Sequence, residues 1–143
     1  MELDYFKMML RSYLREHGFE PEDLESDIVA SNADYANDTF ESARRAGYSV
    51  DGSVELATQE LHTGIGLSPR EVFADLLIND FNDRLHVTDQ MFLEFWIQKL
   101  SDCTSIIQEF SLKDGLGLDP AVLEESRGRL RHRIDQYLRT NGL

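Results

Sequence analysis

The stretch that decides the fold is LSPREVFADLLINDF, at residues 67–81. Ser68 can cap a helix N-terminus, Pro69 suits the first helical position, and Glu71 can reach back to complete a capping box. The apolar residues that follow recur at helical spacing: Phe73, Leu76, Leu77 and Phe81. The stretch therefore predicts a helix that begins after Ser68 and buries one face.

Helical spacing of apolar residues extends to both sides of this stretch, and no run alternates as a strand would. Glycines that can adopt left-handed backbone follow several of the expected segments, as at Gly18, Gly47 and Gly142. We expect further helices at about 3–17, 24–46, 49–61, 89–110 and 119–142. The sequence predicts an all-α fold: a compact multihelical single domain of about six helices, residues 1–143, without a sheet.

The expected helix at 24–46 carries many small residues on one face. Such residues let a neighbouring helix approach closely, so we expect this helix to lie centrally. The face predicted to be inward consists of Ile28, Tyr35, Ala36, Thr39, Ala43 and Ala46.

The charge balance is strongly acidic, with 27 acidic and 14 basic residues and a formal net charge of −13. Such a surface repels nucleic acid and anionic lipid at long range. A solubilising surface is the plain interpretation, and an acidic decoy for a DNA-binding protein is the alternative. The N-terminus lacks the features of a signal peptide, and no apolar run could span a bilayer. We therefore expect a cytoplasmic protein.

Residues with catalytic or metal-binding potential form no recognisable motif. The four histidines (His17, His62, His86 and His132) lack metal-ligand spacing, and Cys103 is the only cysteine, expected to be buried. The glycines at 64 and 66 favour a turn, because a phosphate loop would need a preceding strand and a following Lys-Ser/Thr pair. We expect no cofactor, no metal and no enzymatic activity.

The last expected helix carries a local group of basic residues, which includes Arg129, Arg131 and Arg133. The plain interpretation is a solvated face that pairs with nearby carboxylates. The alternative is a docking face for a nucleic-acid backbone or an acidic partner. Base stacking is not expected, because no aromatic residues are interleaved with these arginines.

Arg127 differs from its basic neighbours because it lies within the apolar stripe of the same helix. A charge in that position needs a partner. We therefore predict a buried ion pair, with Asp80 of the helix at 68–81 as the first candidate. A structural ion pair is the main interpretation, and a pocket with perturbed titration is the alternative.

The segment at 91–97 is apolar on nearly every side and contains Phe92, Phe95 and Trp96. Aromatic residues at this spacing usually build a core. The alternative is an exposed anchor for a partner protein or a second copy of the chain.

Several short runs resemble a known family from end to end of the chain: DYF at 4–6, FESAR at 40–44, GYS at 47–49, LLINDF at 76–81 and YL at 137–138. In these runs the sequence resembles the domain of unknown function 1896, a family of small helical proteins found mainly in Bacteroidetes. The resemblance implies an all-helical fold and no assigned activity. It also implies an association with mobile elements, near genes for DNA processing.

The leading functional hypothesis is a non-enzymatic protein-interaction or accessory module linked to the DNA processing of a mobile element, with a partner protein or a second copy of the chain as its binding partner. The first alternative is nucleic-acid binding through the arginines of the last helix. The second is an enzyme that gathers carboxylates from several helices.

Overall fold

The computed structural model describes residues 3–101, 111–112 and 115–142, and its regular structure is helical. No strand occurs among these residues, although isolated β-bridges join Leu118 to Leu67 and to Ser111. The predicted all-α class is confirmed. The chain forms two compact units, Met1–Ile65 and Gly66–Leu143. The single domain expected for residues 1–143 stays a prediction.

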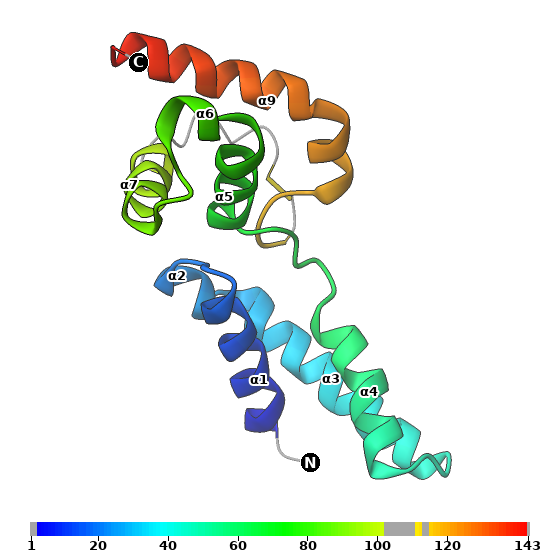
Figure 1. Ribbon diagram of the computed structural model, residues 1–143. Helices are drawn as coiled ribbons and strands as arrows, with labels where there is room; N and C mark the ends of the chain where they lie inside the picture. The colour runs from blue at the N-terminus through cyan, green and yellow to red at the C-terminus, as the bar shows by residue number, and fades with distance from the viewer. Residues whose placement is uncertain (1–2, 102–110, 113–114, 143) are drawn as a thin grey trace. The chain divides into compact units, whose positions relative to one another are not determined.

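The first unit contains four helices: α1 (Leu3–Glu16), α2 (Pro21–Leu24), α3 (Asp27–Arg45) and α4 (Val50–Leu61). Both α1 and α4 pack along α3, which is therefore central to the unit, as its small residues predicted (Figure 1). Glycines end two of these helices in the expected way. Gly18 and Gly47 have φ angles of 81° and 96°, and the N–H after each donates back to the final helical turn.

The inward face of α3 was only partly predicted. Ala36 and Ala43 are buried as expected, but Tyr35 is 62% exposed and Ala46 lies at the exposed end of the helix. The apolar residues actually buried are Val29, Ala33, Ala36, Phe40 and Ala43, so part of the inward face is shifted, with Val29 and Phe40 in place of Ile28 and Thr39. Phe40 explains the shift, because its ring lies 6.2 Å from that of Phe6 in α1 and so rotates this stripe inward.

The helix expected at 24–46 begins three residues later than predicted, at Asp27, and Leu24 is the last residue of a separate short helix, α2. Pro21 occupies the first turn of the short α2, where Glu20 and Asp23 form a reciprocal cap. Ser26 then precedes a new start at Asp27. The break follows from these local signals, which outweigh the continuous apolar spacing.

A buried amide joins α3 to the end of α4. The Asn32 side-chain nitrogen donates to the carbonyl oxygens of Leu61 at 3.0 Å and Thr63 at 2.7 Å. The last carbonyls of a helix have no partner within it. Asn32 therefore satisfies the C-terminal end of α4 and fixes it on α3.

The second unit contains α5 (Pro69–Asp80), α6 (Asn82–Leu85), α7 (Gln90–Ser101) and α9 (Pro120–Thr140). Ser68 and Glu71 form the predicted capping box of α5, and Asp119 caps α9 ahead of Pro120. α6 was not predicted as a separate helix; it begins after Phe81 and ends before His86, whose φ is 53°. The part of the expected helix at 89–110 that follows residue 101, with Cys103, lies outside the described residues.

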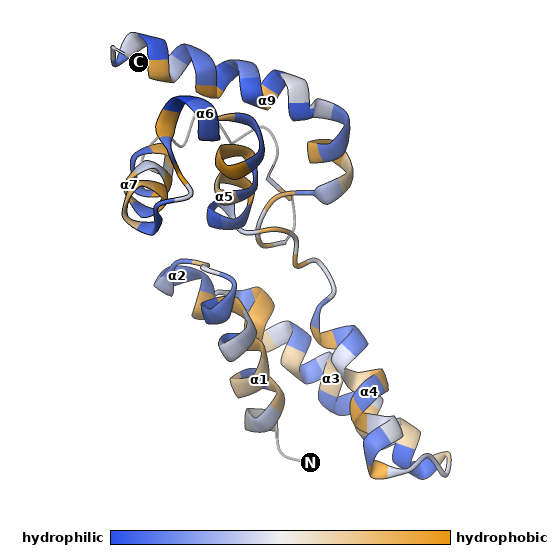
Figure 2. Cartoon of the chain, in the orientation of Figure 1, coloured by the Kyte–Doolittle hydropathy of each residue, from blue (hydrophilic) through white to orange (hydrophobic). Residues whose placement is uncertain are grey.

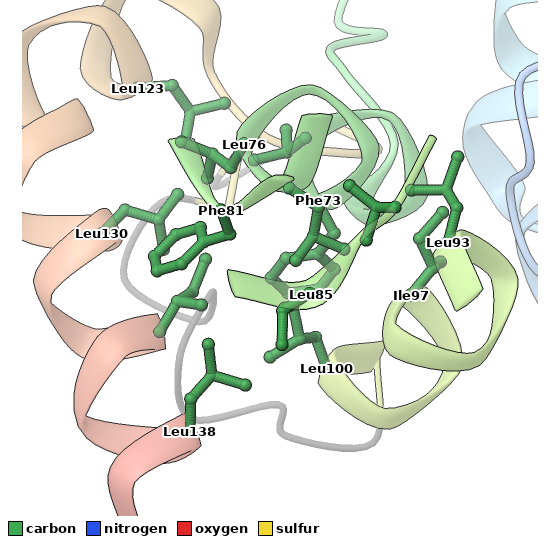
Figure 3. Close-up of a cluster of buried hydrophobic side chains, with 14 of the residues drawn as sticks. Phe73, Leu76, Phe81, Leu85, Leu93, Ile97, Leu100, Leu123, Leu130 and Leu138 are labelled. Carbon is green, nitrogen blue, oxygen red and sulfur yellow. The ribbon is translucent and has the colours of Figure 1, made fainter. Parts of the chain in front are cut away.

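The core of this unit combines α5, α7 and α9. Its central side chains are fully buried, among them Phe73, Leu77, Leu100 and Ile134. In Figure 3, Leu123 and Leu130 extend from α9 toward Leu76 and Phe81. The outer face of α9 is largely hydrophilic, with apolar residues at intervals (Figure 2). The helix is therefore amphipathic and buries one narrow stripe.

A short backbone pairing holds the starts of α5 and α9 together. The N–H of Leu118 donates to the carbonyl of Leu67 at 2.7 Å, and the N–H of Leu67 donates to that of Leu118 at 3.0 Å. The N–H of Gly66 also donates to Leu116, at 2.8 Å. A Cβ at Gly66 would collide with the Leu118 carbonyl and lie 2.9 Å from Cδ1 of Leu112. The pairing therefore requires glycine at this position.

We predict that Gly66→Ala destabilises the second unit by about 1–3 kcal/mol, because the added methyl group must displace backbone. Gly128→Ala is the matched control: a Cβ at Gly128 meets nothing within 4 Å, so helix propensity should make it neutral or stabilising by up to ~1 kcal/mol. Trp96, the only tryptophan, packs on this core and reports its urea unfolding by fluorescence. Equal midpoints for the two variants would refute the steric argument.

We also predict that Asn32→Ala weakens the first unit by about 1–3 kcal/mol, because two carbonyls lose their donor. Hydrogen exchange of the amides at 50–61, followed by mass spectrometry, should be faster in this variant. Asp38→Ala, at an exposed position of the same helix, should change exchange little. Unaltered exchange in Asn32→Ala would show that water replaces the amide without loss.

Candidate interaction surfaces

The outer side of α7 presents large apolar side chains to solvent. Met91 is 81% exposed, and Phe92 and Phe95 are each 50% exposed. Trp96 is half-buried and packs against the core of the second unit. The two interpretations of this segment therefore apply to different residues: Trp96 contributes to the core, and the phenylalanines lie at the surface.

The charged residues of α7 are engaged by neighbours. Glu94 forms an ion pair with Arg70 of α5 and accepts a hydrogen bond from Gln90 at 3.0 Å. The Lys99 ammonium lies 5.5 Å from the centre of the Phe95 ring. The outer face of α7 is thus apolar and nearly neutral, in a chain whose formal net charge is −13.

Arg127 lies beside two carboxylates of α5. Its guanidinium is 2.6 Å from Asp75 and 3.4 Å from Asp80. The structure therefore brings together the residues predicted to pair, but Asp75 is the closer partner. The hydrogen bond from Arg127 to Asp75 is the largest of the effects that raise the pKa of the guanidinium.

This ion pair is partly buried, whereas the sequence predicted a buried pair. The Arg127 side chain is 41% exposed, whereas that of Asp80 is 17% exposed. The aliphatic part of arginine can cover apolar surface while its charged end reaches the edge of a helix pair. Partial exposure also means that the pair is screened by solvent and adds little to stability.

The arginines of the predicted basic face do not form a uniformly positive surface. Arg131 lies 3.9 Å from Asp80, and Arg129 donates to the hydroxyl of Ser126 at 3.3 Å. Arg133 is half-buried. Asp135, two residues further along α9, has its pKa lowered by hydrogen bonds from Arg139 and then Arg84. Carboxylates are therefore interleaved with the arginines that a nucleic-acid backbone would have to contact.

A pocket of about 290 Å³ lies between the first turns of α5 and α9. Its walls are mainly apolar and consist of Leu67, Val72, Leu76, Pro120, Leu123 and Leu130. The charged residues that line it are Glu71, Asp75, Glu124 and Arg127. Its volume is just below the roughly 300–1,000 Å³ typical of ligand pockets, so it suits one or two large side chains better than a cofactor.

Neither this pocket nor the role of Asp75 was predicted from the sequence. The useful signal was present in the repeated pattern Leu67-Ser68-Pro69 and Leu118-Asp119-Pro120. Each copy starts a helix, but spacing within a helix does not show that two starts lie side by side. That information comes from the pairing of Leu67 with Leu118.

A shallow hollow in the first unit is lined by residues of α1 and α4, among them Tyr13, and by His62, which follows α4. The Tyr13 ring centre lies 4.1 Å from that of His17 and 4.4 Å from that of His62. Burial, and then the charge of His17, lowers the pKa of His62. Among the described residues, no carboxylate is shown hydrogen-bonded to His62. The contact of its ring with the ring of Tyr13 accounts for the position of the imidazole.

Neither a metal centre nor a membrane span is found in the described part of the chain. Within residues 3–101, 111–112 and 115–142, no three His, Cys, Asp or Glu side chains are grouped as metal ligands. None of the described helices combines the length and apolar composition needed to cross a bilayer.

We predict that His62 makes the first unit sensitive to mild acid. Because its pKa is lowered from the ordinary value of 6.5 in the folded state, protonation favours unfolding, and stability is lost as the pH falls below about 6.5. The fall in melting temperature between pH 7.5 and 5.5 should be smaller for His62→Gln than for the unaltered chain. His132→Gln, at an exposed position of α9, should retain the full fall. An identical pH dependence in His62→Gln would exclude this role.

Comparison with known proteins places the chain in a family. The model of the family described as "Domain of unknown function (DUF1896)" matches residues 1–138. The fold is similar to the crystal structure of protein PG0816 from Porphyromonas gingivalis, with a TM-score of 0.69 and 21% sequence identity over 99% of this chain and 94% of that chain. No curated protein matches the sequence. The resemblance seen in the sequence is thus confirmed, and the chain belongs to the DUF1896 family.

Proposed function

We propose that this chain is a non-enzymatic protein-interaction module whose contact surface is the outer face of α7. The observation that supports it is the exposure of Met91, Phe92 and Phe95 on one helix. Methionine and aromatic residues are enriched at the centres of protein interfaces, where charged residues are depleted. Exposed phenylalanines also expose apolar area to water, and a partner that covers them recovers that free energy.

The size of this surface favours a reversible contact. Two half-exposed phenyl rings and one methionine present roughly 300 Å² of apolar area, whereas a stable interface covers about 800 Å² on each partner. These side chains would therefore anchor a transient interaction rather than hold an obligate dimer. We extend the proposal to an accessory role in mobile-element DNA processing, the context that the family resemblance implies.

Site-specific photo-cross-linking tests this proposal in the host cell. A photoreactive amino acid in place of Met91 should form covalent products with a partner protein, identified by mass spectrometry. Phe92→Ser combined with Phe95→Ser in the same chain should remove those products, because the apolar anchors are lost. Tyr35→Ser with Tyr48→Ser is the matched control, since both tyrosines are more than half exposed in the first unit.

Products retained in the Phe92→Ser, Phe95→Ser variant would refute the proposal. A product with twice the mass of the chain would identify the partner as a second copy. Thermal unfolding followed by Trp96 fluorescence shows whether each variant keeps the folded second unit.

A further inference from the structure

The pocket between α5 and α9 is separate from the α7 surface, because none of its lining residues belongs to α7. Val72, Leu76, Leu123 and Leu130 form buried apolar walls, while Leu67 is 37% exposed and reaches the pocket's edge. Water in contact with such walls is displaced favourably by an apolar group.

Carboxylates predominate among the charged residues of the pocket. Glu71, Asp75 and Glu124 line it together with the single guanidinium of Arg127. That guanidinium is already engaged by Asp75 and Asp80. An anionic ligand would therefore meet repulsion from the carboxylates and would have to compete for Arg127.

We propose that this pocket binds a basic amphipathic segment of a partner protein, with a large apolar side chain inserted between α5 and α9. A lysine or arginine about one helical turn from that side chain would then lie beside Glu124 or Asp75. The apolar insertion supplies affinity, and the carboxylates select segments with flanking cations. The chain's formal net charge of −13 adds long-range attraction for the same class of segment.

The arrangement of Glu124 and Glu125 offers a matched pair of test positions. Both are exposed on α9, but only Glu124 lines the pocket. Substitution of either by lysine changes the net charge of the chain equally. A ligand attracted only by net charge would respond equally to both changes, whereas a ligand seated in the pocket would distinguish them.

The experiment measures fluorescence anisotropy with three labelled synthetic helices of about 18 residues. One carries leucine and lysine on opposite faces, a second carries leucine and glutamate, and a third carries serine and lysine. At about 0.15 M salt, charges more than ~8 Å apart are largely screened. Only the leucine–lysine helix is expected to bind.

Glu124→Lys should weaken that binding by about tenfold, because one attraction becomes a repulsion, and Glu125→Lys should weaken it less than about threefold. Leu67→Ser should also weaken it, unlike Ile78→Ser, a half-exposed control on α5 outside the pocket. Melting curves followed by Trp96 fluorescence verify that each variant is folded.

Three outcomes would overturn the proposal. The first is no binding of the leucine–lysine helix. The second is equal binding of either comparison helix, which would remove the need for the apolar side chain or for the cation. The third is an equal loss in Glu124→Lys and Glu125→Lys, which would show attraction by net charge alone. Binding of the leucine–lysine helix should be retained in the Phe92→Ser, Phe95→Ser variant, which separates the pocket from the α7 surface.

Discussion

Two backbone hydrogen bonds between Leu67 and Leu118 determine how the second unit is built. Each of these leucines is followed at once by a capping residue and a proline, so α5 and α9 begin side by side from one paired point. The pairing sets which residues of the two helices face each other. Gly66 permits the close approach of the two backbones, since any side chain there would meet the carbonyl of Leu118. The pocket between the first turns is a direct consequence.

Opposite charges meet where α5 and α9 pack together in this unit. The arginines of α9 are close to carboxylates of α5, as in the contacts of Arg127 with Asp75 and Asp80. These pairs are partly exposed, so their contribution to stability is small. Their more important effect is on recognition, because cations that are already paired attract a phosphate backbone less strongly. The same pairing leaves the carboxylates of the pocket in excess.

The helix ends were predicted from the sequence better than the buried helix faces, because the signals for helix ends lie in adjacent residues. The capping box at Ser68 and the left-handed turn at Gly47 depend on a few adjacent residues, so their sequence signals are sufficient. The inward face of α3 depends on Phe40 meeting Phe6 from another helix. The exposed Tyr35 could not be distinguished from a buried aromatic without that contact.

The same limit applies to the candidate sites. A partner for Arg127 was predictable, because a charge in an apolar stripe needs one. The choice of Asp75 as the closer carboxylate depends on how far α9 is displaced along α5, and no spacing within one helix encodes that distance. At residues 91–97, the apolar pattern predicted a helix. It did not predict that Trp96 is half-buried while Phe92 and Phe95 are exposed.

The two surfaces of the second unit differ in how they could select a partner. Apolar area on α7 contributes binding free energy with little discrimination, since many apolar segments can cover two phenyl rings. In the pocket, an apolar side chain must enter beside several carboxylates, and segments without a nearby cation are penalised. Selective binding in the pocket therefore requires an apolar contact and a contact between opposite charges within a few ångströms of each other. On this argument the α5–α9 pocket has the greater capacity for specific recognition, even though α7 exposes more apolar surface.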